Sequence, residues 1–110
     1  MPHFNKSDTI PIVDLGNGIQ RQMLGYDSNL TLVRVYFEKG AVGEAHTHPH
    51  QQATYIEEGR FEVEIERVKK MLSAGDSFSV SGDMEHSVVA LEQGILIDAF
   101  SPAREDFLAH

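Results

Sequence analysis

The stretch that decides the fold runs from Gly40 to Gly59 and reads GAVGEAHTHPHQQATYIEEG. Three histidines alternate in it, at His46, His48 and His50. Residues i and i+2 of a β-strand project from the same face, so this spacing predicts that His46 and His48 face one divalent ion. Pro49 lacks a backbone donor and is expected to end the strand, which places His50 outside the ligand set. Surface or core histidines are an equally good explanation of the H-x-H pair taken alone.

Strand-like runs on both sides of this stretch predict an all-β protein. The clearest is the run 61–65, where Phe61, Val63 and Ile65 alternate with glutamates, as in a half-buried strand. Periodicity leaves open whether the strands build a sandwich or a barrel. Further strands are expected within residues 10–15, 19–24, 29–40, 53–58, 69–73, 77–80, 86–91 and 94–100, separated by turns that mostly contain Gly, Asn or Asp.

Composition bounds the class of protein. A chain of 110 residues fits one domain spanning 1–110, and 41% hydrophobic with 24% charged residues is typical of a soluble globular protein. The net charge of −8 argues against nucleic acid and anionic membranes as partners. The absence of cysteine excludes disulfides and thiolate metal sites, and favours the cytoplasm. The N-terminus lacks the pattern of a signal peptide, and no apolar run reaches the length of a membrane span.

The C-terminal stretch GILIDAFSPAREDFL, residues 94–108, contains a second group of candidate residues. Asp98 and Phe100 share one face of the last predicted strand, and both faces are largely apolar, so Asp98 is expected in the interior. A carboxylate there is costly unless it is paired or functional. Arg104 follows at the start of a predicted short helix over about 103–109, near the barrel mouth. Alternatively, Phe100 is plain core and Arg104 a surface partner of a neighbouring acid.

Two motif spacings resemble the cupin superfamily. Gly40, His46, His48, Gln52 and Gly59 match its first motif, G-x5-H-x-H-x3/4-E-x6-G, with Gln52 at the glutamate position. The second motif, G-x5-P-x-G-x2-H-x3-N, begins at Gly75 and reaches His86, while Ser81, Asp83 and Ala90 depart from it. The resemblance implies a single-domain cupin jelly-roll β-barrel with a core of about 29–101. It also implies one divalent metal ion, held by His46, His48, Gln52 and His86. A barrel that has lost its metal is the alternative.

Glutamine in place of glutamate has a chemical consequence. A neutral amide leaves a divalent site at its full +2 charge, which would anchor an anionic substrate in an acidic chain. Gln51 has the opposite strand parity and is the weaker ligand candidate. Such ligands suit zinc, nickel, iron, manganese or cobalt, and the sequence does not choose among them. A site that merely tolerates an amide is the alternative.

The resemblance narrows further over about residues 29–108. The segments HTHPHQQ, EEGRFEV, AGDSF and EHSVVALEQGILIDAFSPAREDFL resemble KdgF-type cupins, uronate lyases that linearise 4,5-unsaturated monouronates from pectin and alginate. This implies a small anionic sugar as substrate and catalytic roles for Asp98, Phe100 and Arg104. A metal-dependent cupin dioxygenase and a non-enzymatic cupin that binds a sugar or small acid remain as alternatives. Small single-barrel cupins usually pair, and residues 29–37 are apolar on both faces, so a homodimer is expected.

Overall fold

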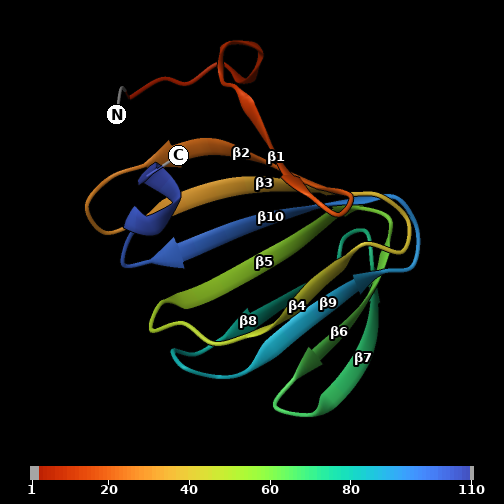
Figure 1. The fold of residues 1–110 in the computed structure, drawn as a ribbon. Helices are drawn as coiled ribbons and strands as arrows, with labels where there is room; N and C mark the ends of the chain where they lie inside the picture. Colours follow the sequence, from red (N-terminus) through yellow and green to blue (C-terminus); the bar gives the residue numbers. More distant parts are fainter. Residues whose placement is uncertain (1–2, 110) are drawn as a thin grey trace.

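The structure, a computed structural model, describes residues 3–109 and contains ten strands in two sheets (Figure 1). The six-stranded sheet has the order β1 (Ile12–Gly16), β2 (Ile19–Tyr26), β3 (Thr31–Phe37), β10 (Gly94–Ser101), β5 (Gln51–Glu58) and β8 (Ser77–Val80). The four-stranded sheet has the order β4 (Val42–His46), β9 (His86–Ala90), β6 (Arg60–Ile65) and β7 (Val68–Ser73). Two short 3-10 helices, η1 (Ser7–Thr9) and η2 (Glu105–Ala109), lie near the ends of the chain.

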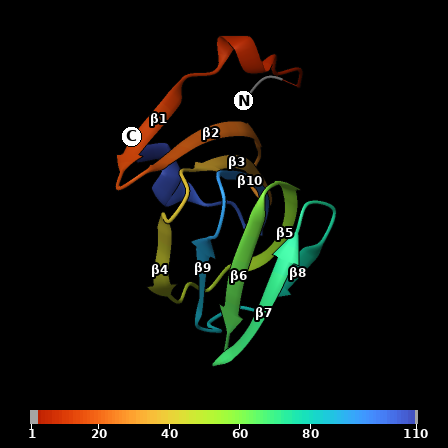
Figure 2. The same cartoon turned by 90° about the vertical axis from the view of Figure 1, so that its right-hand side faces the viewer.

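The strand order is that of a double-sheet jelly roll, in which β3-β10-β5-β8 faces β4-β9-β6-β7 (Figure 2). The prediction of an all-β fold is therefore confirmed. The expected closed barrel is not observed, because within residues 3–109 no ladder of hydrogen bonds joins the two sheets. Connecting segments link the sheets instead, such as residues 38–41, which lead from β3 in the six-stranded sheet to β4 in the four-stranded sheet.

The space between the sheets is apolar at one end and polar at the other. The inward-facing residues of β10 change from Leu96 to Asp98, and those of β5 change from Ile56 to Thr54 and Gln52. This division separates the hydrophobic core from a polar end where a site can form. The core cluster comprises Phe37, Ala41, Ile56, Phe61, Val63, Val88, Ala90 and Leu96, from both sheets.

The turn from β5 to β6 requires glycine at position 59. Gly59 has φ +87°, and a Cβ there would lie 2.6 Å from the Gln93 carbonyl oxygen. We expect Gly59→Ala to lower the free energy of unfolding by about 2–4 kcal/mol, from the left-handed backbone plus the close contact. Chemical denaturation measures this. Gly75→Ala is the control, because Gly75 has φ +98° with nothing within 4 Å of a new Cβ. Equal losses in both variants would contradict the role of the contact.

The hairpin between β6 and β7 turns at Glu66 and Arg67, with φ of 46° and 69°. Two consecutive left-handed residues form the tight turn that suits the twist of a hairpin. Gly, Asn and Asp favour that conformation, and none of them is present, so the sequence indicated the turn only weakly.

The short C-terminal helix predicted over about 103–109 is, in the structure, only a 3-10 helix from Glu105 to Ala109. The bond from the Phe107 N–H to the Arg104 carbonyl, at 3.0 Å, has the i to i+3 spacing of that helix. Buried Ala103 and the bond from the Arg104 N–H to Thr31 Oγ1 hold the preceding residues to the sheet, which leaves little chain for an α-helix. Within residues 3–109, no helix is long and apolar enough to span a bilayer.

Candidate metal centre and catalytic pocket

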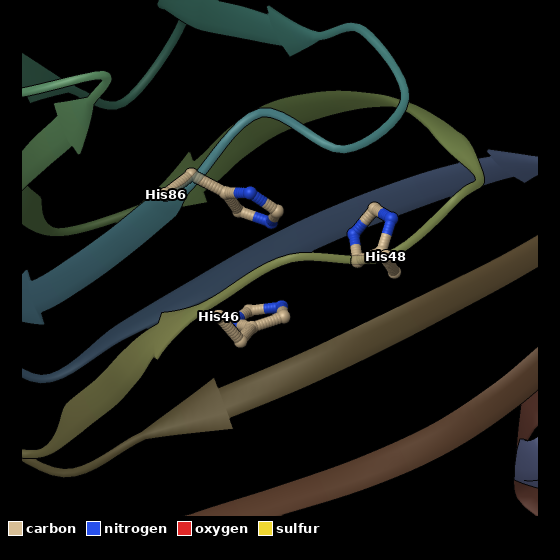
Figure 3. A group of neighbouring side chains, drawn as sticks. All are labelled: His46, His48 and His86. Carbon is tan, nitrogen blue, oxygen red and sulfur yellow. The ribbon is translucent and has the colours of Figure 1, made fainter.

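Three histidines predicted as ligands meet at the polar end of the sandwich (Figure 3). His46 ends β4 and pairs in register with His86, the first residue of β9, while His48 lies in the loop after β4. Their ring centres are 4.3 to 5.4 Å apart. One nitrogen from each ring lies within 4.8 Å of the others. Three imidazoles in this arrangement are a donor set for one divalent ion.

The strand argument for His48 was wrong, because β4 ends at His46. A neighbouring turn positions His48 instead: the Asp83 N–H donates to the His48 carbonyl at 2.7 Å. Gly82 lies in the same turn, where a Cβ would be 2.6 Å from the Pro49 carbonyl oxygen. The turn that precedes His86 therefore holds the loop that carries His48.

Backbone carbonyls fix the orientation of all three rings. Nδ1 lies 2.7 Å from the Glu44 carbonyl oxygen in His46, 2.9 Å from that of His50 in His48, and 2.9 Å from that of Met84 in His86. A carbonyl oxygen only accepts, so each Nδ1 carries the proton and each Nε2 presents a lone pair. Outer partners of this kind orient histidine ligands in metal sites.

The donor atoms fit a divalent cation. The Nε2 atom of His86 is buried and has no hydrogen-bond partner among residues 3–109. The Nε2 atom of His48 faces Gln52 Oε1 at 3.0 Å, so two acceptors meet when the imidazole is neutral. Burial lowers the pKa of both His48 and His86, which favours the neutral form that binds metals. A cation between these lone pairs would satisfy all of them.

Gln52 connects the histidines to a buried carboxylate. Its Nε2 donates to Thr54 Oγ1 at 2.8 Å and to Asp98 Oδ1 at 3.4 Å, and the Thr54 hydroxyl donates to Asp98 Oδ1 at 2.6 Å. These bonds orient the amide so that its oxygen faces His48. Gln51 is exposed, in line with its expected opposite parity.

Asp98 is only 8% exposed, so it lies in the interior as its strand position predicted. Burial raises the pKa of its carboxyl to about 6, although the Thr54 hydrogen bond and the charge of Arg104 oppose the shift. A carboxyl group with that pKa accepts and returns a proton readily near neutral pH.

The remaining predicted residues, Phe100 and Arg104, lie beside this group. Phe100 is buried, and its ring centre is 5.7 Å from that of His48. The Arg104 guanidinium lies 4.8 Å from the centre of the Phe100 ring and binds Asp106 through Nε at 2.9 Å and Nη2 at 2.6 Å. This ion pair lowers the pKa of Asp106 to about 2. Arg104 is thus both a partner of Asp106 and part of the pocket wall.

A cavity of about 250 Å³ is lined by every predicted site residue except His48. Residues of both sheets line the cavity, and its surface is mostly apolar. A molecule bound there would be shielded from bulk water. Its volume suits a molecule the size of one sugar ring. The polar lining residues are Arg21, His46, Gln52, His86, Asp98 and Arg104.

Comparisons with known proteins give the family. A model of the cupin domain matches residues 33–98. The chain is 45% identical over 110 residues to the pectin degradation protein KdgF of Dickeya dadantii (strain 3937), an alignment that covers 98% of this chain and 100% of that protein. This chain belongs to the cupin family and is a close relative of KdgF.

Solved structures agree with this assignment. This cupin is 48% identical to an RmlC-like cupin from Shewanella frigidimarina NCIMB 400, with a TM-score of 0.95 over 97% of this chain and 96% of that one. It is 42% identical to KdgF from Halomonas sp., with a TM-score of 0.91 over 94% of this chain and 98% of that one.

Sequence reasoning missed three residues of the site: Arg21 and Phe107, which line the cavity, and Thr54, which donates to Asp98. The Arg21 guanidinium lies 4.1 Å from the centre of the Phe107 ring, and Phe107 in turn packs edge-on against Phe100. A signal for Arg21 existed, because it shares a strand face with Ile19 and Met23 in the predicted run 19–24. A cation on an otherwise apolar face is as conspicuous as the carboxylate of Asp98.

Proposed function

We propose that this cupin opens the ring of 4,5-unsaturated monouronates from pectin or alginate breakdown in a metal-dependent reaction, giving a linear keto-uronate. The observation that carries the proposal is the buried Asp98 carboxylate joined through Gln52 and Thr54 to the histidine cluster. The similarity to a pectin degradation protein over the whole chain supports the substrate class.

His46, His48, Gln52 and His86 are the residues that would hold the divalent ion. When bound, the ion would supply Lewis-acid polarisation of a substrate oxygen, and a neutral amide ligand would leave its charge undiminished. Three of these residues, His46, Gln52 and His86, line the cavity, so the site that would hold the ion adjoins the space proposed for the substrate.

Asp98 is the proposed acid and base. Ring opening begins when a base removes the proton of the anomeric hydroxyl, so that the C1 carbonyl forms and the bond from C1 to the ring oxygen breaks. The ring oxygen leaves as an enolate oxygen at C5, while the proton stays on Asp98. Asp98 then returns the proton at C4, and C5 becomes a ketone. The reaction is an isomerisation and needs no further reactant.

Phe100 and Arg104 form the proposed substrate wall. The Phe100 ring keeps water from one side of the sugar, and Arg104 adds positive charge for the carboxylate. In a chain of net charge −8, local cations are what make an anionic substrate acceptable.

A proton NMR time course on 4,5-unsaturated galacturonate tests the function, since loss of the vinylic C4 proton reports the reaction directly. We expect turnover by zinc-loaded protein without oxygen, and none after the metal has been removed by chelation. A requirement for oxygen would favour a dioxygenase. Stabilisation by the sugar without product would favour a non-enzymatic binding cupin.

We also propose that the protein is a homodimer. Large apolar side chains on the outer face of the six-stranded sheet are exposed, including Leu32 at 38% and Tyr55 at 48%. Pairing of two copies would cover such a surface. Sedimentation velocity at micromolar concentration is expected to give a dimer, and a clean monomer would contradict this.

A further inference from the structure

Arg21 lines the catalytic cavity from a strand that contributes no other proposed catalytic or metal-binding residue. It lies on β2 opposite Val35 of β3, and it is 9% exposed. Val33, two positions further along β3, pairs with Asp98 of β10. Arg21 and Asp98 are therefore two strands and two residues apart, about 12 Å between Cα atoms, on the inner face of the same sheet. Both residues line the cavity of about 250 Å³.

The guanidinium of Arg21 is influenced by the charge of Asp106 but forms no ion pair or hydrogen bond within residues 3–109. It lies over the Phe107 ring, 4.1 Å from the ring centre. The other arginine of the cavity, Arg104, already binds Asp106 through two nitrogens. Of the two arginines that line the cavity, Arg21 is therefore the one whose guanidinium N–H groups are available to bind an anion.

Leaving this cation unpaired is unfavourable. Burial lowers the pKa of Arg21, and the charge of Arg104 adds to that effect, while Asp106 only partly offsets it. A buried charge that lacks a counter-ion is stabilised when an anion arrives. The Phe107 ring, which lies 4.1 Å from both guanidinium groups, holds the side chains in place before the anion binds.

We propose that Arg21 is a substrate-binding residue whose free fork binds the carboxylate of the uronate, with Arg104 as a second cation beside it. The fork matches the two oxygens of a carboxylate, which makes the contact selective for acidic over neutral sugars. The inference rests on the proposed function for the identity of the substrate.

Binding of non-reacting sugars tests Arg21 apart from catalysis. Saturated D-galacturonate is titrated into zinc-loaded, ¹⁵N-labelled protein, and D-galactose is the neutral comparison. We expect galacturonate to shift the Nε–H signal of Arg21 and galactose to leave it in place. Arg21→Met should weaken galacturonate binding about 10-fold to 100-fold and leave galactose binding unchanged.

The control is Arg34→Met, because Arg34 lies on the outer face of the same sheet and pairs with Glu57 at 3.4 Å. It should bind galacturonate as the wild type does.

Kinetics on 4,5-unsaturated galacturonate should show a KM raised about 10-fold to 100-fold in Arg21→Met with a smaller change in kcat. If that variant fails to fold, Arg21→Lys keeps the charge without the fork and should lose about 10-fold.

The outcomes separate this inference from the proposed function. A folded Arg21 variant with unchanged galacturonate affinity and unchanged KM would overturn the role of Arg21 and leave the enzyme activity intact. Galacturonate binding that depends on Arg21, with no turnover of the unsaturated sugar by the wild type, would support Arg21 as a carboxylate site and overturn the ring-opening function.

Discussion

Replacing His86 with alanine is expected to lower the affinity for zinc by at least about 100-fold and to abolish ring opening. The reason is that His86 Nε2 is buried, has no hydrogen-bond partner among residues 3–109, and belongs to the group of three converging histidines. Zinc titration followed by elemental analysis of the dialysed protein measures the loss, and the NMR time course measures activity.

His50→Ala is the matched control for His86. The His50 ring lies 5.6 Å from that of His48, yet its nitrogens are outside the group of three that converge. We expect this variant to keep its zinc. Retention of one zinc per chain at wild-type affinity in His86→Ala would mean that the converging nitrogens do not form the metal site.

Asp98→Asn is expected to lower kcat by about 10²-fold to 10⁴-fold, the usual contribution of a positioned acid or base. Metal content should not change, because the residues proposed to hold the ion are all retained. The melting temperature of the ion-free protein should not fall, since an amide replaces a carboxylate whose charge is disfavoured by burial. Turnover by NMR, elemental analysis and a thermal melt measure the three quantities.

Thr54→Val provides the comparison for Asp98. It removes the hydroxyl that donates to Asp98 Oδ1 at 2.6 Å but keeps the carboxylate, so a smaller loss of kcat is expected. Full activity in Asp98→Asn would remove Asp98 from the mechanism. Loss of zinc together with activity would instead assign Asp98 a structural role in orienting Gln52.

Local patterns in the chain predicted much of the fold. Alternation across residues 61–65 appears in the structure as β6, with Phe61 and Val63 in the core. The strand and turn around Asp98 were equally clear, since β10 covers residues 94–101. Such patterns are local, because a strand with one buried face alternates apolar and polar side chains from one residue to the next. A jelly roll was expected only from the resemblance to cupins, and the expected closure into a barrel was wrong, because closure depends on which distant strands pair.

Sequence reasoning placed Asp98 in the site by a correct argument, whereas it placed His48 there by a wrong one. Burial of Asp98 followed from two apolar faces on one strand, and the structure agrees. His48 was included through strand parity, whereas a bond from the Asp83 N–H in a remote turn positions it. Arg21 was overlooked, although its charge on an apolar strand face is a signal of the same kind as the carboxylate of Asp98.

By itself, the sequence determined which segments become strands, which residues face inward, and which side chains have the chemistry to bind a metal or move a proton. These follow from alternation, turn residues and donor types, all of which are properties of near neighbours. Only the tertiary structure decided that His46, His48 and His86 converge, that Asp106 binds Arg104, and that Arg21 forms no ion pair within residues 3–109. Most of those relations join residues far apart in the chain, such as β2 and the C-terminal segment, and strand pairing together with contacts between loops sets their distances.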